Sequence, residues 1–236
     1  MSEPLRHGKL STVTIKTHTS APSRPHAVAH AVVIVRIGAD DPRWDTALEC
    51  SQDHVKKGYR VQVFLHGQAV AAWLADPPAA LRALDRDPSV DVVVCQAAWR
   101  RLELADEPPL AVASLVGLWS TMLRADLISV FGQGDWPAVS GDWPSVAVAP
   151  PSPGVAWGVM VERGVDGQER QSLVEFVLAA AVLELDVAVA FGPQALGELS
   201  GESARGWAQL TDHDLAHVIT TASDDARYHE RHWLVP

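Results

Sequence analysis

The feature that most limits what this chain can fold into is an internal repeat. Three apolar segments of the first half recur in the second half at a constant offset of 126 residues. Unrelated segments seldom keep identical loop lengths across three strands. The spacing therefore predicts two copies of one unit, packed against each other as a pseudo-dimer. The matched positions include Val33 and Val159, Val63 and Val189, Val92 and Val218, and the helical segments 43–57 and 169–183.

The apolar segments of the first half have the character of buried strands. Each is short, rich in β-branched residues and bounded by turn-forming residues, as expected for a parallel sheet. The segments between them carry apolar residues at helical spacing, and Pro42 and Gly58 mark the ends of the first helix. This alternation predicts an α/β fold with a parallel, doubly wound sheet. The expected strands are 31–37, 59–65, 92–95 and 126–131, and the expected helices are 43–57, 71–74, 79–84 and 110–123.

Composition divides the chain into four segments. Residues 1–29 are rich in Ser, Thr, Pro and His without periodicity, which predicts a flexible tail. Residues 30–131 form the first unit, and residues 132–154, with two Gly-Asp-Trp-Pro copies, form a linker. Residues 155–236 form a shortened second unit, because too little chain follows Thr221 for a further helix and a full strand. The last residues are expected to add a short edge strand.

Charge and cysteine content exclude several classes of function. The formal net charge is -10 and no basic patch stands out, so direct binding of nucleic acid or an anionic membrane is not expected. Two cysteines, Cys50 and Cys95, exclude a disulfide framework and a thiolate-rich metal site. The sequence has no apolar signal core and no stretch long enough to span a membrane, which predicts a cytoplasmic protein.

One cysteine lies where a reactive thiol is expected. Cys95 follows the run Val92–Val94 at the carboxyl end of a strand, where ligands gather in open α/β sheets. A helix start after Cys95, together with Arg100 and Arg101, is expected to lower the pKa of the thiol. The alternative is a buried structural cysteine. The offset of 126 places Cys95 on Thr221, so only the first unit carries a thiol at this edge.

Two further residues bear on this candidate site. His66 follows the second strand at the same sheet edge, where it could act as an acid or base or tune the thiol. The alternative for His66 is a histidine hydrogen-bonded to the backbone. Cys50 lies on the flank of the helix over 43–57, and we interpret it as a packing residue that reacts slowly with alkylating reagents. The glycines at 38–40 and 132–134 are not phosphate-binding fingerprints, so no flavin, nucleotide or metal cofactor is expected.

Several motifs occur together in one known family. In the first half they are the strand end with Val61, Val63, Phe64 and Gly67; Cys95-Gln96-Ala97-Ala98 with Arg100 and Arg101; Leu115, Gly117 and Leu118; and the strand Ala125–Phe131. In the second half they are Arg170, Leu173, the strand Leu185–Phe191 and the turn Gln194–Leu196. The first half resembles the DsrE/TusD subunits of sulfur-relay complexes, and the second half is similar to the TusC/DsrF subunits. The resemblance covers residues 31–221 and departs at Leu102, where the family often has glycine.

This resemblance implies two tandem DsrE-like units and a sulfurtransferase that carries sulfur. In the family, the cysteine that matches Cys95 accepts sulfane sulfur as a persulfide and passes it to a partner protein. Arg100, Arg101 and His66 would tune the thiolate, and no cofactor is implied. The implied partners are sulfur donor and acceptor proteins, a TusA-like carrier among them, in tRNA thiolation or dissimilatory sulfur oxidation.

Two other classes of function stay open at this point. In the first, the chain is a non-catalytic scaffold subunit of the same fold, with Cys95 merely buried. In the second, it is a flavodoxin-like enzyme for a small ligand, which the missing phosphate loop disfavours. The apolar helices over 111–123 and 174–185 also predict a homo- or hetero-oligomer with DsrE-fold subunits, because they carry more apolar surface than one sheet face needs.

Overall fold

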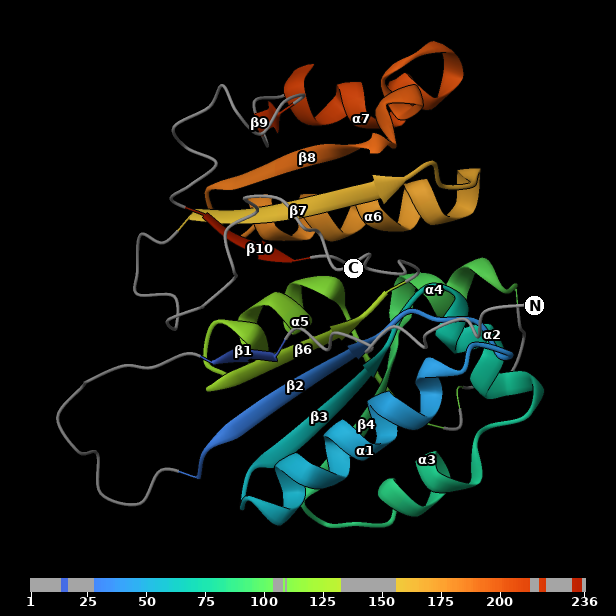
Figure 1. Ribbon diagram of the computed structural model, residues 1–236, viewed down its shortest axis with the longest axis vertical. Helices are drawn as coiled ribbons and strands as arrows, with labels where there is room; N and C mark the ends of the chain where they lie inside the picture. Colours follow the sequence, from blue (N-terminus) through green and yellow to red (C-terminus); the bar gives the residue numbers. More distant parts are fainter. Residues whose placement is uncertain are drawn as a thin grey trace, which may run out of the picture.

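The structure, a computed structural model, describes residues 14–16, 28–103, 108, 110–132, 156–212, 217–219 and 231–234. Two sheets flanked by helices lie one above the other in Figure 1. The predicted α/β class is therefore correct. The linker 132–154, apart from Gly132, and Thr221 lie outside the described residues, as does most of the expected tail.

The first sheet has the order β1-β6-β2-β3-β4-β5. The five strands from β6 to β5 are parallel, and β1 pairs antiparallel with β6. Their runs of valine and isoleucine are buried, as a parallel sheet covered by helices requires. The strands are β1 (Thr14–Lys16), β2 (His30–Val35), β3 (Arg60–Leu65), β4 (Val90–Cys95), β5 (Ala111–Ala113) and β6 (Leu127–Phe131).

Local sequence signals explain where the helices of this half begin and end. The first helix starts after Pro42 and is followed by Gly58, whose φ of 84° suits a residue without a side chain. Pro77 and Pro78 separate the second helix from the third, as the sequence predicts. The helices are α1 (Arg43–Lys56), α2 (Gln68–Ala75), α3 (Ala79–Leu84), α4 (Gln96–Arg101) and α5 (Leu115–Met122).

Two segments differ from the sequence-based expectation. The helix predicted over 110–123 begins only at Leu115, because the Ser114 hydroxyl caps it by accepting a hydrogen bond from Gly117 N at 3.0 Å. The preceding residues form β5 instead and pair with β4. Thr14–Lys16, within the segment predicted to be a flexible tail, form β1 on the edge of the sheet.

The second sheet has the order β10-β7-β8-β9, and all its pairs are parallel. The last strand, β10, pairs with β7 as the edge strand expected near the end of the chain. The elements are β7 (Ala156–Arg163), α6 (Gly167–Ala181), β8 (Val187–Gln194), a 3₁₀ turn (Leu196–Leu199), α7 (Gly201–Asp212), β9 (His217–Ile219) and β10 (Arg231–Leu234).

Strand pairing in the two sheets follows the same offset as the sequence. Ala31 pairs with Val61 in the first sheet, and the positions 126 residues later, Trp157 and Val187, pair in the second. Val63 pairs with Val92, and the pair Val189 and Val218 corresponds to it. The register of three strands is thus the same in both sheets.

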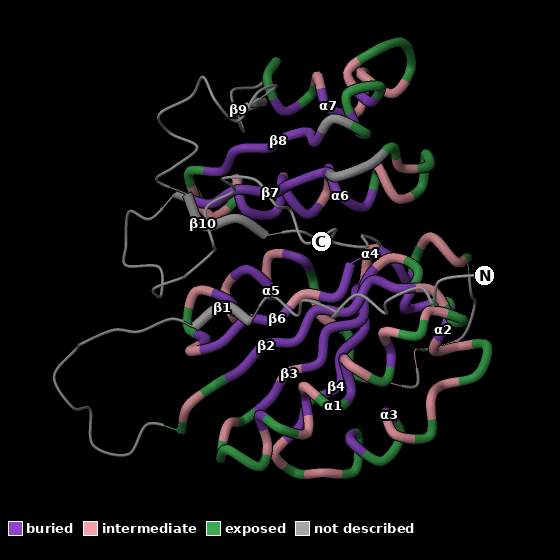
Figure 2. Tube along the Cα trace, viewed as in Figure 1, coloured by how far each residue is buried: buried purple, intermediate pink, exposed green. Residues whose placement is uncertain are grey.

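The two halves share one hydrophobic core. Helices α5 and α6 lie between the sheets (Figure 1), and both helices contain buried stretches (Figure 2) that belong to one core cluster. Trp119 of α5 donates its indole N–H to Phe176 O of α6 at 2.8 Å, and its ring packs against that of Phe176 at an interplanar angle of 35°. Trp157 of β7 packs edge-on against Trp119. The apolar faces that predicted association with other chains are therefore used in packing within the chain, and oligomerisation stays an untested prediction.

None of the described helices combines the length and apolar character that crossing a membrane requires.

Candidate functional site

Three chemically active side chains follow neighbouring strands at one edge of the first sheet. Arg36 comes directly after β2, His66 directly after β3, and Cys95 ends β4. The backbone keeps them at the sheet edge, because Arg36 N donates to Phe131 O at 2.8 Å and His66 N donates to Val35 O at 2.9 Å. Parallel strands end side by side, so this placement follows directly from the topology.

Cys95 lies at the predicted edge, but its environment differs from the prediction. The residue is 0% exposed. Burial raises the pKa of the Cys95 thiol, and this effect outweighs the interactions that lower it, from the backbone N–H groups of Ala98 and Ala97 and the charge of Arg101. The expected low pKa was therefore wrong, because the sequence does not show what covers the strand end.

The structure separates the two arginines after Cys95. Arg100 is exposed and does not line the site. Arg101 points toward the second half, where its Nη1 atom forms an ion pair with Glu175 of α6. Of the two arginines, only Arg101 lines the cavity and acts to lower the pKa of Cys95, and the thiolate-tuning role itself stays a prediction.

His66 makes its hydrogen bond to the second half rather than to Cys95. Its Nε2 atom lies 2.8 Å from the hydroxyl of Ser172 on α6, and the residue is 0% exposed. Burial, followed by the charges of Arg36 and Arg101, lowers the pKa of His66 well below its ordinary value. The imidazole is therefore neutral near pH 7, which removes it as a cationic partner for a thiolate.

Arg36 is the functional residue that sequence reasoning missed. It is 2% exposed, and burial lowers its pKa to about 10 despite the charges of Glu169 and Cys95, which act in the opposite direction. The sequence contains a sign of this role, because Arg36 is a charged residue flanked directly by the apolar, buried Val35 and Ile37. A lone cation at the end of an apolar strand run indicates a function or a buried partner.

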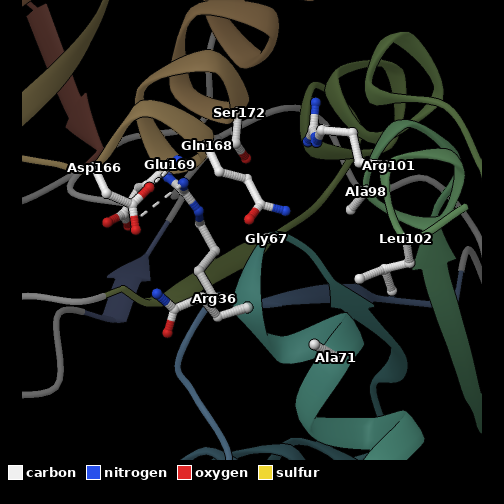
Figure 3. A pocket seen from close by; sticks show the side chains of 11 residues that line it. Arg36, Gly67, Ala71, Ala98, Arg101, Leu102, Asp166, Gln168, Glu169 and Ser172 are labelled. Atoms are coloured by element: carbon white, nitrogen blue, oxygen red, sulfur yellow. Dashed lines mark hydrogen bonds and ion pairs between the residues drawn. The ribbon is translucent and has the colours of Figure 1, made fainter.

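A cavity of about 110 Å³ lies between the halves at this edge. Arg36 and Arg101 point into it from opposite sides, and Ser172 and Gln168 of α6 project into it from above (Figure 3). Cys95 does not line the cavity, but its thiol interacts electrostatically with both arginines. The complete lining is Arg36, Gly67, Gln68, Ala71, Ala98, Arg101, Leu102, Asp166, Gln168, Glu169 and Ser172.

Cys50 occupies a different kind of environment. It is half-buried on α1, with its Sγ atom 3.4 Å from His54 Nε2 and 3.5 Å from Ser129 Oγ. Burial raises the pKa of the Cys50 thiol and lowers that of the His54 imidazole. The Cys50 side chain is thus more accessible than that of Cys95.

Within the described segments, no group of three or more His, Cys, Asp and Glu side chains is arranged to hold a metal ion. Comparisons with protein-family models, with curated proteins and with solved structures find no match to this chain.

Proposed function

We propose that the chain is a tandem DsrE-like sulfurtransferase that accepts sulfane sulfur as a persulfide on Cys95 and passes it to a partner protein. The repeated strand register supports two related units, and the sequence resemblance supports their family. The observation that carries the proposal is the position of Cys95 at the carboxyl end of β4, within the field of Arg36 and Arg101.

The transfer of sulfur to Cys95 needs no cofactor. The deprotonated Sγ of Cys95 attacks the outer sulfur of a donor persulfide R–S–SH. The donor S–S bond breaks as the new S–S bond to Cys95 forms, and the donor leaves as a thiol that takes up the proton lost by Cys95. The two guanidinium groups favour the anionic thiolate and the anionic persulfide that replaces it.

Burial of Cys95 defines how the donor must approach. The second half contacts this sheet edge through the pairs Arg101–Glu175 and His66–Ser172. Transfer therefore requires that α6 moves away from this edge, because a protein donor such as a TusA-like carrier cannot reach a fully buried thiol. Opening also lowers the pKa of Cys95, since burial is the main cause of its rise. In this proposal the protein works in the cytoplasm, together with the sulfur donor and acceptor proteins.

The burial of Cys95 also supports a second candidate function, that of a scaffold subunit. A cysteine that is 0% exposed and whose pKa burial raises also fits a scaffold subunit, in which Cys95 packs and does no chemistry. The two candidates differ in whether Cys95 gains sulfur in the native protein.

The test is the intact mass of the native protein after exposure to a persulfide donor. The wild-type and Cys50→Ser proteins are expected to gain one sulfur atom, and Cys95→Ser is expected to gain none. Fragment mass spectra then place the sulfur. Transfer to Cys50 alone, or none in a folded wild-type protein, rejects the carrier and favours the scaffold.

A further inference from the structure

The cavity between the halves contains a cation whose hydrogen-bonding capacity is only partly used. Within the described part of the chain, the buried Nε and Nη1 atoms of Arg36 have no hydrogen-bond partner. The Oε1 atom of Glu169 forms an ion pair with Nη2 at 3.8 Å, beyond hydrogen-bond distance. A buried charge whose donors are unmet is strongly unfavourable. Packing alone therefore does not explain why a guanidinium is enclosed here.

Other donors converge on the same space. Among the residues that the structure describes, the buried Nη2 atom of Arg101 has no hydrogen-bond partner either. The amide of Gln68 and the hydroxyl of Ser172 line the cavity beside the two arginines. Gly67 brings the backbone close: a Cβ added there would lie 3.7 Å from Ser172 Oγ and 3.8 Å from Arg36 Nε.

We propose that this cavity is a binding site for a small tetrahedral oxyanion, held by the guanidinium groups of Arg36 and Arg101. Such an anion supplies several acceptor oxygens at once, which matches the planar donor fork of an arginine. About 15 Å³ suffices for one water molecule, so a cavity of about 110 Å³ has room for an ion of this class.

Two carboxylates in the lining restrict where the anion sits. Asp166 is exposed and caps α6, with its Oδ1 atom accepting a hydrogen bond from Glu169 N at 2.8 Å. The Glu169 carboxylate lies on the Nη2 side of Arg36. The anion therefore occupies the part of the cavity toward Arg101 and Ser172. The negative charge of Asp166 and Glu169 favours a small ion over an extended polyanion.

The anion site does not depend on the chemistry of Cys95, which is not part of the lining. Sulfate, thiosulfate and phosphate are all small tetrahedral oxyanions, so each of them fits the proposed site. Separate titrations with each ion therefore show which of the three the site binds. The variant Cys95→Ser is expected to keep the sulfate affinity of the wild type, so failure of sulfur transfer and failure of anion binding are separate results.

The test is isothermal titration of the full chain with sodium sulfate, thiosulfate and phosphate, against sodium chloride at matched ionic strength. Saturable binding of at least one of the three, at one ion per chain, is expected, and none for chloride. Arg36→Met is expected to weaken binding about tenfold or more, and Arg101→Gln to weaken it less. The matched control Arg60→Met, at an exposed arginine at the amino end of β3, away from the carboxyl end that His66 follows, keeps the wild-type affinity. No saturable binding to the wild type, or equal affinity in Arg36→Met, overturns the proposal.

Thermal unfolding separates this site from a purely structural Arg36. In buffer without oxyanions, Arg36→Met is expected to unfold close to the wild-type temperature, because the variant loses a buried charge with unmet hydrogen-bond donors together with its ion pair to Glu169. The bound anion is expected to raise the midpoint of the wild type and not that of the variant. A variant that is destabilised or unfolded without anion shows that Arg36 is structural. If Arg101→Gln then also keeps full anion affinity, the proposal fails.

Discussion

The two cysteines of this chain lie in regions with opposite properties. Cys95 is fully buried at a sheet edge where Arg36 and Arg101 provide positive charge. Cys50 is half-buried on a helix, with neutral hydrogen-bonding neighbours in His54 and Ser129. The more accessible thiol therefore lacks the electrostatic environment for anionic chemistry, and the thiol with that environment is covered. Accessibility and electrostatic activation are separate properties of a thiol, and in this chain they belong to different cysteines.

The largest expected difference is in native-state alkylation. Cys95 is expected to react with iodoacetamide roughly a hundredfold more slowly than Cys50, because it must wait for an opening that costs a few kcal/mol. Mass spectrometry of time points, with single Cys→Ser variants for assignment, measures both rates. In urea the two rates are expected to converge. This order reverses the one expected from sequence, and equal native rates would contradict the closed edge around Cys95.

The pH dependence of stability compares the histidines of the two regions. His66 stays neutral in the folded protein, whereas the unfolded chain binds a proton below about pH 6.5. The unfolded state then holds more protons, so stability falls as the pH drops below that value. The free energy of unfolding is expected to fall, because of His66, by up to about 1.4 kcal/mol for each pH unit below that value.

Urea unfolding between neutral and mildly acidic pH measures this slope. His66→Gln is expected to flatten it more than His54→Gln, because the charges of Arg36 and Arg101 add to burial only at His66. A slope that depends on His54 alone would show that His66 is protonated in the folded protein.

Truncation to alanine compares the packing of the two thiols. Cys95→Ala is expected to lower the free energy of unfolding by about 1 kcal/mol, since a fully buried sulfur is lost and a small void remains. Cys50→Ala is expected to cost less than about half of that, because its side chain is only half-buried. Chemical denaturation of both variants checks the ranking, and a larger loss for Cys50 would reverse it.

The smallest effect concerns the ion pair that closes the edge. Arg101→Gln removes the pair with Glu175, whose side chains are 21% and 27% exposed. Because such a pair contributes at most about 1 kcal/mol, alkylation of Cys95 is expected to rise up to about fivefold, with Cys50 unchanged.

The control for this variant is Arg82→Gln, which removes an exposed pair with Asp76 that is formed by neither of the elements that carry the cysteines. It is expected to leave both alkylation rates unchanged. If Arg101→Gln behaves like this control, the ion pair does not hold α6 over Cys95.

Local sequence signals predicted most of the fold. Pro42, Gly58 and the pair Pro77-Pro78 mark helix ends that the structure confirms, since these residues act through their own backbone geometry. The boundary at Leu115 was missed, because the cap by Ser114 and the pairing of β5 with β4 compete with a helical pattern that starts earlier.

The candidate site was predicted only in part. Cys95, His66 and Arg101 lie at the expected edge, because parallel strands end together. Arg36 was overlooked, and Arg100 is exposed and does not line the cavity. The contacts of His66 with Ser172 and of Arg101 with Glu175 join residues that are 106 and 74 positions apart in the chain. No local pattern could have paired them.

The sequence by itself determined the α/β class, most strand and helix positions and the offset that relates the two halves. These depend on side-chain periodicity and on proline and glycine geometry, which act over a few residues. Only the tertiary structure decided that α6 contacts His66 and Arg101, that Arg36 faces a cavity and that burial raises the pKa of Cys95. Desolvation depends on every atom that excludes water from a site, and those atoms come from segments far apart in the chain.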